Sequence, residues 1–342
     1  MNLGILCPSE IAYRRFLPAL ADIDTVHFIG VAVNSVTERY GSNIPNSSEV
    51  QSMLIRGKNK ASLMIKEYGG KIYDSYAEII EDKSIDALYI PLPPALHYHW
   101  AKEALAFGKH ILVEKPFTAS LNDTLTLVEE AKTHNLAIHE NYMFLFHKQV
   151  QVIKQLIDSG ELGDIRQYRI SFGFPRRQAT DFRYNKALGG GALLDAGGYT
   201  IKYANWLLGG NAKVEYAKLN RISDFDVDLF GSGVLANEEG TTVQIAFGMD
   251  NEYKCELEVW GSKGTLSTGR ILTAPTGFVP QANLKIENKE SVMNLPSDNA
   301  FRNSILHFIK CIEDPAYRTE NYNAIKRQAI LVNEFVERAK KS

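Results

Sequence analysis

The alternation of short apolar runs with helical patterns over the first 140 residues constrains the fold of this chain most. Strand-like runs occur at Leu3–Cys7, Phe28–Val33, Lys71 onward, Ile85–Pro93, His110–Pro116 and Leu136–Asn141. Strands that alternate with helices in this way form a parallel sheet with crossover helices. The sequence therefore predicts a Rossmann-type, doubly wound α/β domain over residues 1–140.

The pattern changes after about Gln149, where several runs show the period-two alternation of half-buried strands. These runs are Tyr168–Pro175, Val214–Ile222, Phe230–Asn237, Thr241–Met249, Lys254–Ser262 and Thr265–Gly269. We expect residues 141–342 to form a second, α+β domain with a mostly antiparallel, open sheet. Its helical C-terminus is expected to be able to pack back on the first domain. After the second strand of the first domain, the segment Gly41–Asn59 is rich in Ser, Asn, Pro and Gly and interrupts the alternation of strands and helices. This composition predicts an inserted loop beside that strand.

Composition excludes several classes of function. The formal net charge is -2 with no long basic run, which argues against nucleic acid and acidic membrane partners. Cys7, Cys255 and Cys311 lie far apart without a CxxC pair, and neither a secretory signal nor a membrane-spanning apolar run is evident. We therefore expect a cytoplasmic protein with reduced thiols.

The first strand-to-helix turn reads Cys7-Pro8-Ser9-Glu10 where dinucleotide-binding domains carry glycines. Against the fingerprint G-x-G-x-x-G/A, the three positions are Cys7, Ser9 and Ala12, all of them small. The turn fits a pyrophosphate site in which Glu10 and Ile11 open the helix, and it equally fits an ordinary turn without a ligand.

The end of the second strand bears on cofactor selectivity. A carboxylate there would bind both ribose hydroxyls of NAD, but this chain has the neutral Asn34 and Ser35, with Arg39 one turn later. The absence of a carboxylate favours NADP. The alternative is a polar loop without selectivity.

The segment "VEKPFT" follows the strand that begins at His110, at the sheet edge where such folds bind ligands. Lys115 can reach a ligand there as a proton donor or clamp, unless Glu114-Lys115-Pro116 is only a surface turn. Three further candidates to line a cofactor crevice come from the preceding strand end: Pro91, Leu92 and His97. Although His97, His99, His139 and His147 are suggestive of metal binding, no carboxylate cluster supports them, and we expect no metal.

The Gly-rich segment Gly189–Gly209 predicts a helix entered through a turn of three glycines. Asp195 and Tyr199 are four residues apart and therefore share one helix face. A carboxylate and a phenol on one face suit proton transfer to a substrate hydroxyl, although a capping Asp and a core Tyr would look the same.

Three arginines precede this turn: Arg176, Arg177 and Arg183. Arginine forks recognise phosphate, which favours a substrate that carries phosphate groups, while a solvated charge run remains the alternative.

The order of these motifs resembles that of the Gfo/Idh/MocA oxidoreductase family. The first turn carries Cys7 and Ser9 in place of glycines, E-K-P follows the parallel strands, and "ENYMFLFH" and "GGGALLDAGGY" come after it. The resemblance covers nearly the whole chain. It implies a Rossmann domain and a second domain whose open sheet packs against another subunit, hence a homodimer or homotetramer.

The resemblance also implies roles for individual residues. Lys115, Asp195 and Tyr199 take the catalytic positions, with Tyr199 as proton donor or acceptor and Lys115 assisting; Tyr142 is a candidate substrate contact. The tyrosine is similar to that of a branch that includes 3-ketosugar reductases, glucose-fructose oxidoreductase and dimeric dihydrodiol dehydrogenases.

These expectations combine into one predicted function, hydride transfer between a nicotinamide, preferably of NADP, and a sugar carbonyl or hydroxyl, most specifically as a nucleotide-linked ketosugar reductase. Two alternatives stay open. One is a dehydrogenase of a free sugar, an inositol or a trans-dihydrodiol. The other is a non-catalytic sensor or scaffold with the same fold.

Overall fold

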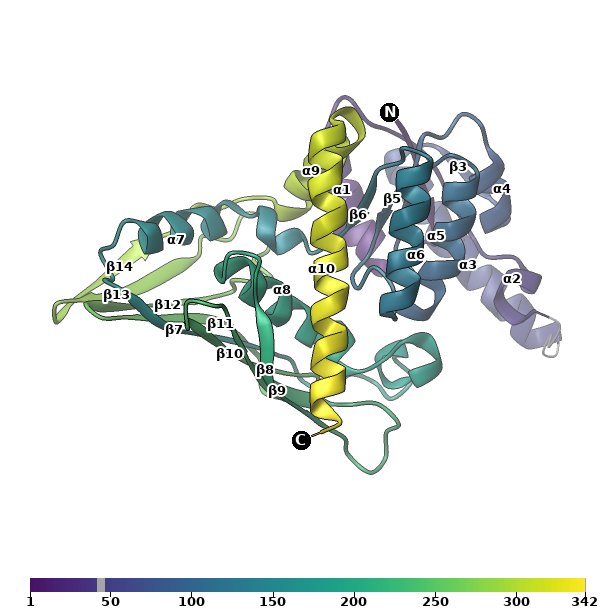
Figure 1. Ribbon diagram of the computed structural model, residues 1–342. Coiled ribbons are helices and arrows are strands. Elements are labelled where there is room, and N and C mark those ends of the chain that lie inside the picture. Colours follow the sequence, from purple (N-terminus) through teal and green to yellow (C-terminus); the bar gives the residue numbers. More distant parts are fainter. Residues whose placement is uncertain (42–46, 342) are drawn as a thin grey trace. The chain divides into compact units, whose positions relative to one another are not determined.

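Six short strands near the N-terminus form one parallel sheet in the computed structural model, which describes residues 1–41 and 47–341 (Figure 1). In sheet order the strands are β3 (Lys71–Tyr73), β2 (His27–Ala32), β1 (Asn2–Leu6), β4 (Ala87–Ile90), β5 (His110–Val113) and β6 (Ile138–Glu140). The central strand β4 is buried at every residue, as expected for a strand covered on both faces. The strand order reverses between β1 and β4, and ligands bind outside the carboxyl ends of strands at such a reversal.

Helices connect these strands as crossovers. They are a π-helical turn η1 (Ala12–Phe16) continued by α1 (Leu17–Ala21), then α2 (Val36–Tyr40), α3 (Ser47–Tyr68), α4 (Tyr76–Glu81), α5 (Pro94–Ala106) and α6 (Leu121–Thr133). Buried aromatic rings join helix to sheet: Phe16 of η1 stacks on Tyr89 of β4 with ring centroids 3.7 Å apart. The predicted doubly wound domain is confirmed.

The segment Gly41–Asn59, predicted to be a loop, is largely helical. Residues 42–46 lie outside the described residues, but α3 begins at Ser47 and runs to Tyr68. The reason is a stripe of Met53, Gly57, Ala61 and Met64 at helical spacing, in which Met53, Ala61 and Met64 are buried. The polar composition of the segment concealed this periodicity, so the loop prediction was wrong.

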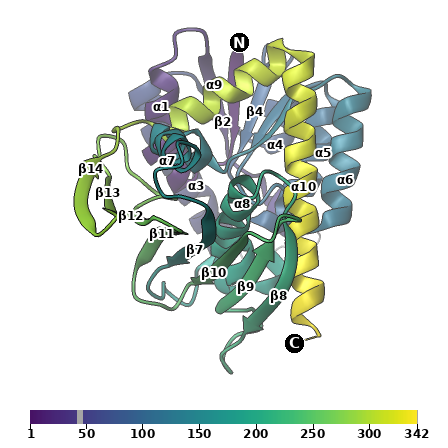
Figure 2. The ribbon, with the colours of Figure 1, turned by 60° about the vertical axis from the view of Figure 1, so that its left-hand side comes forward.

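Eight strands of the second half form a mixed, mostly antiparallel sheet (Figure 2). In sheet order they are β14 (Lys289–Asn294), β13 (Gln281–Ile286), β12 (Gly264–Gly269), β11 (Lys254–Gly261), β7 (Ile165–Gly173), β10 (Thr242–Gly248), β9 (Phe230–Ala236) and β8 (Lys213–Asn220). Only β7 and β10 pair in parallel among these described strands. β13 and β14 were not predicted, because their residues are largely polar and exposed.

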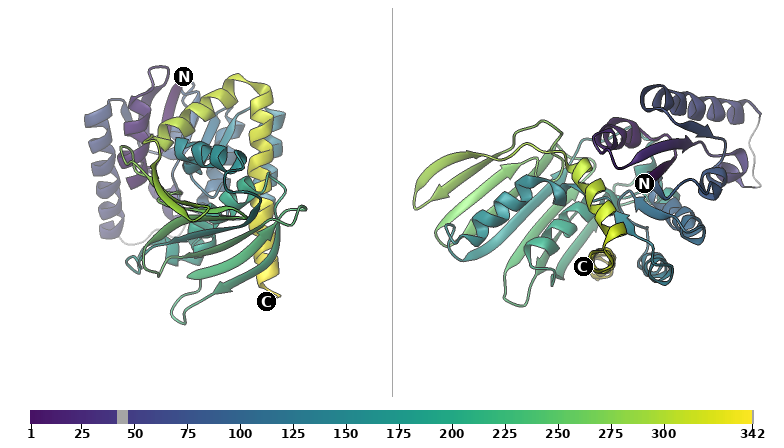
Figure 3. Two further views of the ribbon diagram at one scale, coloured as in Figure 1. Left: turned by 90° about the vertical axis from the view of Figure 1, so that its left-hand side faces the viewer. Right: turned by 90° about the horizontal axis from the view of Figure 1, so that it is seen from above.

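Helices cover one face of this sheet, and the other face is open (Figure 3). The covering elements are α7 (Lys148–Asp158), a π-helical turn η5 (Leu193–Gly197) and α8 (Gly198–Leu207). In β11 the residues alternate strictly between exposed and buried, so that Cys255, Leu257 and Val259 pack into the core. The predicted fold class is thereby confirmed for this sheet too.

The chain divides into two units that are described separately below. The first consists of Met1–Thr118, Asn122–Asn141 and Ile305–Asn323, and the second of Ala119–Leu121, Tyr142–Ser304 and Ala324–Ser342. The C-terminal helices α9 (Ala300–Glu313) and α10 (Pro315–Ala339) contribute to both. Within the first unit, Arg318 and Tyr322 of α10 donate hydrogen bonds to the carbonyls of Asn135 and Leu136. No helix in residues 1–41 and 47–341 is long and apolar enough to span a membrane.

Candidate functional site

The turn after β1 has the backbone that glycine usually provides, although its first residue is Cys7. Cys7 has φ 103°, in the left-handed region that side chains rarely adopt. Its amide donates to the carbonyl of Ala32 at 3.2 Å, and the Ser9 amide donates to the carbonyl of Cys7 at 2.8 Å. The Ser9 hydroxyl accepts the amide of Ala12 at 3.2 Å. A tight turn ahead of a helix start therefore exists here without glycine, and its geometry fits a pyrophosphate.

The Cys7 thiol lies among groups from three helices. Burial raises its pKa, and a hydrogen bond with Tyr76 of α4 and the positive charges of Lys60 and Arg39 lower it in part. A raised pKa keeps the thiol neutral at pH 7, so it adds no negative charge beside a bound phosphate.

The predicted selectivity loop after β2 is organised by Glu38, a residue the sequence reasoning missed. Ser35 caps α2 by accepting the Glu38 amide at 3.3 Å, and the Glu38 carboxylate accepts the Ser35 amide at 2.7 Å. The same carboxylate accepts the amides of Tyr76 and Ala77, at 3.1 and 3.0 Å. The S-x-x-E spacing of this capping box was the available signal. Asn34 and Ser35 are half-buried at this loop, and Arg39 is exposed.

His97 braces two loops at the carboxyl ends of β4 and β5. Its ring is fully buried, with Nε2 2.7 Å from the carbonyl of Leu92 and Nδ1 2.8 Å from the carbonyl of Pro116. Burial lowers its pKa to about 4, although both carbonyls raise it. The ring therefore connects the loops that contain Leu92 and Pro116, and the contact of His97 with a cofactor stays a prediction.

Glu114 and Lys115 follow β5 directly. The Glu114 carboxylate accepts the Tyr89 hydroxyl and the Asn141 side-chain amide, both at 2.6 Å, and burial raises its pKa. The peptide between Lys115 and Pro116 is cis, and the next amide, of Phe117, donates to the buried carboxylate of Glu140 at 3.0 Å. The side chain of Glu114 and the amide of Phe117 are both hydrogen-bonded, which fixes the chain before and after the half-buried Lys115.

In the second unit, the Gly-rich turn presents Asp195 to an arginine. Gly189 and Gly191 have φ 77° and 124°. Asp195 accepts a hydrogen bond from Arg183 Nε at 2.6 Å, and Arg183 also pairs with Asp181 at 3.2 Å. Arg183, predicted to bind substrate phosphate, is thus committed to two carboxylates.

Tyr199 lies in a cluster of aromatic rings within the same unit. The rings of Tyr142, Phe144 and Phe172 have centroids 5.1, 5.6 and 5.3 Å from that of Tyr199. The Tyr199 hydroxyl is 3.9 Å from the sulfur of Met143. Tyr142, a predicted substrate contact, is itself buried and packs edge-on against Tyr199. Contacts on several sides restrict the rotation of the Tyr199 ring.

The remaining arginines differ in their partners. Arg176 makes a bidentate pair with Asp250, at 3.1 and 2.6 Å, and lies over the ring of Phe225. Arg177 lies over the ring of Phe174, 5.3 Å from its centroid. Of the three predicted phosphate ligands, Arg177 is therefore the one whose contacts in this structure leave phosphate binding open.

The histidines suggestive of a metal site have other contacts. His147 Nδ1 accepts the amide of Gln149 at 3.1 Å, His139 packs on His307, and His99 packs edge-on against Trp100. Within residues 1–41 and 47–341, no three His, Cys, Asp or Glu side chains gather as metal ligands would.

Comparison with known protein families gives two matches, which follow one another along the chain. Residues 25–142 match the description "Oxidoreductase family, NAD-binding Rossmann fold", and residues 150–267 match "GFO/IDH/MocA C-terminal domain". The chain belongs to the Gfo/Idh/MocA oxidoreductase family. This membership confirms the predicted enzyme class, an oxidoreductase with a Rossmann domain.

Relatives match over almost the entire chain. A dTDP-3,4-didehydro-2,6-dideoxy-alpha-D-glucose 3-reductase of Saccharopolyspora spinosa is 34% identical, covering 97% of this chain and 95% of the relative. A 3-ketoreductase from Actinomadura kijaniata, solved in complex with NADP and TDP-benzene, superposes with TM-score 0.87 at 31% identity and covers 97% of this chain and 96% of that chain. A mouse trans-1,2-dihydrobenzene-1,2-diol dehydrogenase is 27% identical, over 73% of this chain and 75% of the relative.

Proposed function

We propose that this protein is an NADP-dependent reductase of a nucleotide-linked ketosugar. The observation that carries the proposal is the end-to-end similarity to dTDP-ketosugar 3-reductases, together with an intact set of Lys115, Asp195 and Tyr199. The dihydrodiol dehydrogenase and a D-xylose 1-dehydrogenase of Haloferax volcanii match with lower identity and coverage. They favour a free sugar or diol as the second candidate substrate.

The spacing of the catalytic pair supports this assignment. Structures of the Actinomadura kijaniata enzyme include one variant with a substituted tyrosine and another with a substituted lysine. Along that chain the two positions are separated by the same number of residues as Lys115 and Tyr199 are here. Lys115 belongs to the first unit and Tyr199 to the second, so their meeting at one substrate is part of the proposal.

The residues suit the two ends of a dinucleotide. We assign the pyrophosphate to the turn Cys7–Ile11, the adenosine ribose to Asn34, Ser35 and Arg39, and the nicotinamide to Pro91, Leu92 and Glu114. The left-handed Cys7 and the Ser9 hydroxyl give the first turn the shape that this needs. His97 supports this edge from behind by bracing Leu92 and Pro116.

NADPH, when bound, supplies the hydride that reduces the sugar carbonyl. The chain's own contribution is charge and position. Tyr199 donates a proton to the carbonyl oxygen, while the Lys115 ammonium stabilises the negative charge that develops there. The aromatic cluster packs around the Tyr199 ring, and Arg183 holds Asp195 through the hydrogen bond from its Nε. Arg177 is our candidate for the nucleotide phosphates.

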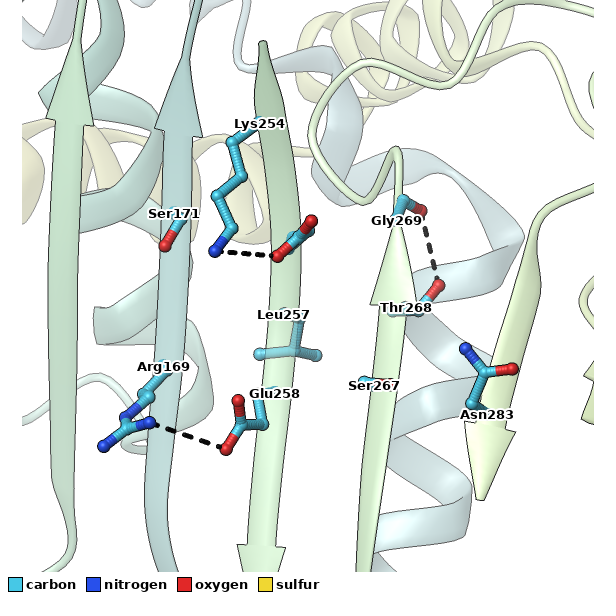
Figure 4. Close-up of a pocket in the computed structure, with 10 residues that line it drawn as sticks. Arg169, Ser171, Lys254, Leu257, Glu258, Ser267, Thr268, Gly269 and Asn283 are labelled. Carbon is cyan, nitrogen blue, oxygen red and sulfur yellow. Dashed lines mark hydrogen bonds and ion pairs between the residues drawn. The ribbon is translucent and has the colours of Figure 1, made fainter. Parts of the chain in front are cut away.

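We further propose that the open sheet face is the surface of a homodimer or homotetramer. Figure 4 shows polar side chains along this face, where Arg169 pairs with Glu258 and Lys254 with Glu256. Trp260 and Tyr216 are about half exposed in this sheet, at 54% and 46%. A cytoplasmic location is consistent with three free cysteines.

The test is oxidation of NADPH, followed by its absorbance, with a dTDP-3-ketosugar as substrate. Lys115→Ala and Tyr199→Phe are expected to lower kcat by about 100-fold or more, because each removes a group acting in proton transfer. Unfolding in urea checks that both variants are folded. Wild-type turnover in both variants would refute the assigned roles. A wild-type protein that binds neither NADPH nor NADH would indicate the scaffold alternative.

A further inference from the structure

Helix α3 packs against β2 and β3, next to the strand end that carries the predicted ribose site. Gly57 marks the contact, because a methyl group there would lie 3.6 Å from the Cγ1 atom of Val33. Val33 directly precedes Asn34 and Ser35. The middle of α3, at Gly57, therefore lies next to the strand residue that leads into the selectivity loop.

Two contacts show which way the flanks of α3 face. Lys58 on one flank pairs with Asp74, just after β3, with Nζ 2.9 Å from Oδ1. Glu67 on the opposite flank accepts a hydrogen bond at 2.7 Å from the hydroxyl of Tyr13 in η1, the element that follows β1. Successive residues of an α-helix are rotated by about 100°, which places Lys60 on the same flank as Glu67. Lys60 therefore faces β1 and its turn, whereas Lys58 faces β3.

The pKa of the Cys7 thiol in the turn after β1 agrees with this arrangement. The positive charges of Lys60 and Arg39 both lower the pKa of the Cys7 thiol against the larger effect of burial. Arg39 comes from α2, whose position is set by the Glu38 carboxylate bonded to the first amides of α4. Two cations from different helices thus lie beside the turn after β1.

Two carboxylates of this edge have hydrogen-bond or ion-pair partners of their own. Glu38 accepts three backbone amides, those of Ser35, Tyr76 and Ala77. Asp74 pairs with Lys58. Over these five side chains, the three positive charges of Lys58, Lys60 and Arg39 exceed the two negative charges of Glu38 and Asp74 by one, so this edge has a net positive charge.

We propose that Lys60 binds the 2′-phosphate of NADP together with Arg39, and that α3 thereby supplies selectivity for NADP over NAD. The inference rests on the proposed function and assigns its cofactor selectivity to a residue of α3. A phosphate monoester dianion on the ribose matches two cations that approach from α2 and α3. The same ribose in NAD has free hydroxyls and no phosphate there, so it offers these cations no negative charge to bind.

The experiment is calorimetric titration of the full-length protein with NADPH, NADH and adenosine 2′,5′-bisphosphate. Lys60→Ala is expected to raise the Kd for NADPH and for the bisphosphate about tenfold, the loss of one charge-assisted hydrogen bond, and to change that for NADH by less than about twofold. Lys60→Arg should restore most of the affinity. Lys58→Ala is the matched control, a lysine on the other flank of the same helix, and should leave all three Kd values unchanged.

The outcomes separate this inference from the function on which it rests. If wild type prefers NADPH and Lys60→Ala keeps that preference, Lys60 is not a 2′-phosphate ligand, although the reductase assignment stands. Equal weakening of NADPH and NADH would also overturn it, since Lys60 would then act on the whole dinucleotide. If wild type binds neither dinucleotide, both the inference and the proposed function fail.

Discussion

The two turns that open the predicted motifs use different residues for similar backbone geometry. Cys7 in the first unit has φ 103°, and Gly191 in the second has φ 124°. At Cys7 a side chain is accommodated, and its thiol contacts Tyr76. At Gly191 an added Cβ would lie 2.5 Å from Oδ1 of Asp228. A glycine requirement therefore has two separable causes, backbone conformation and space, and at Gly191 the second adds a clash that Asp228 must relieve by moving.

The groups that support the two turns also differ. Around the first unit's strand ends, the neutral imidazole of His97 lies between the carbonyls of Leu92 and Pro116 and can donate to one of them. Behind the second turn, the Asp228 carboxylate accepts the amide of Leu193 at 2.7 Å, and Arg183 pairs with Asp195. Acid should therefore weaken the first region through a base that must become charged, which gives the comparison a pH-dependent test.

The largest effect is expected for Gly191→Ala. The new methyl group would displace Asp228 and strain the backbone, so we expect the free energy of unfolding to fall by about 4 kcal/mol. Urea denaturation measures it. Gly240→Ala is the matched control, because Gly240 has φ 84° with no atom within 4 Å of an added Cβ, and should lose about 1 kcal/mol. Equal losses in the two variants would show that space plays no part.

A smaller effect is expected from acidification through His97. Its pKa is lowered from 6.5 to about 4 in the folded protein, so the unfolded chain binds the proton more readily. The stability that the neutral ring contributes is fully present above pH 6.5 and is lost as the pH falls towards 4. The loss amounts to about 3 kcal/mol.

The measurement is urea unfolding at several pH values between 7 and 4, for wild type and His97→Asn. The variant should be less stable at pH 7 but should lose about 3 kcal/mol less on acidification. Parallel pH profiles for the two proteins would mean that His97 does not carry this dependence.

Sequence periodicity predicted the parallel and the antiparallel sheet, because each strand type buries its residues in its own repeat. It failed where composition obscured the repeat, as in α3, whose buried Met53, Ala61 and Met64 are surrounded by polar residues. It also missed β13 and β14, whose residues bury too little surface to leave a pattern.

The residues of the candidate site that belong to short local motifs could be predicted from the sequence. Their hydrogen-bond partners, which lie far away along the chain, could not. Lys115, Asp195 and Tyr199 belong to contiguous motifs. Their supporting carboxylates do not: Glu140 accepts the amide of Phe117, and Asp228 accepts that of Leu193, each across a long stretch of chain. Such pairings depend on the register of the folded strands and loops, which no short motif encodes. The commitment of Arg183 to Asp195 was hidden for the same reason.

The smallest effect isolates backbone conformation at the first turn. Cys7→Gly and Cys7→Ala both remove the thiol and its contact with Tyr76, so the two variants differ in how readily residue 7 adopts φ 103°. Glycine reaches this region without steric strain, whereas alanine does not. We expect Cys7→Gly to be more stable than Cys7→Ala by about 1 kcal/mol, somewhat offset by the greater freedom of glycine in the unfolded chain. Chemical denaturation of the pair measures the difference. If alanine proves the more stable residue, conformation is not what the turn after β1 requires, and the contrast drawn with Gly191 loses its basis.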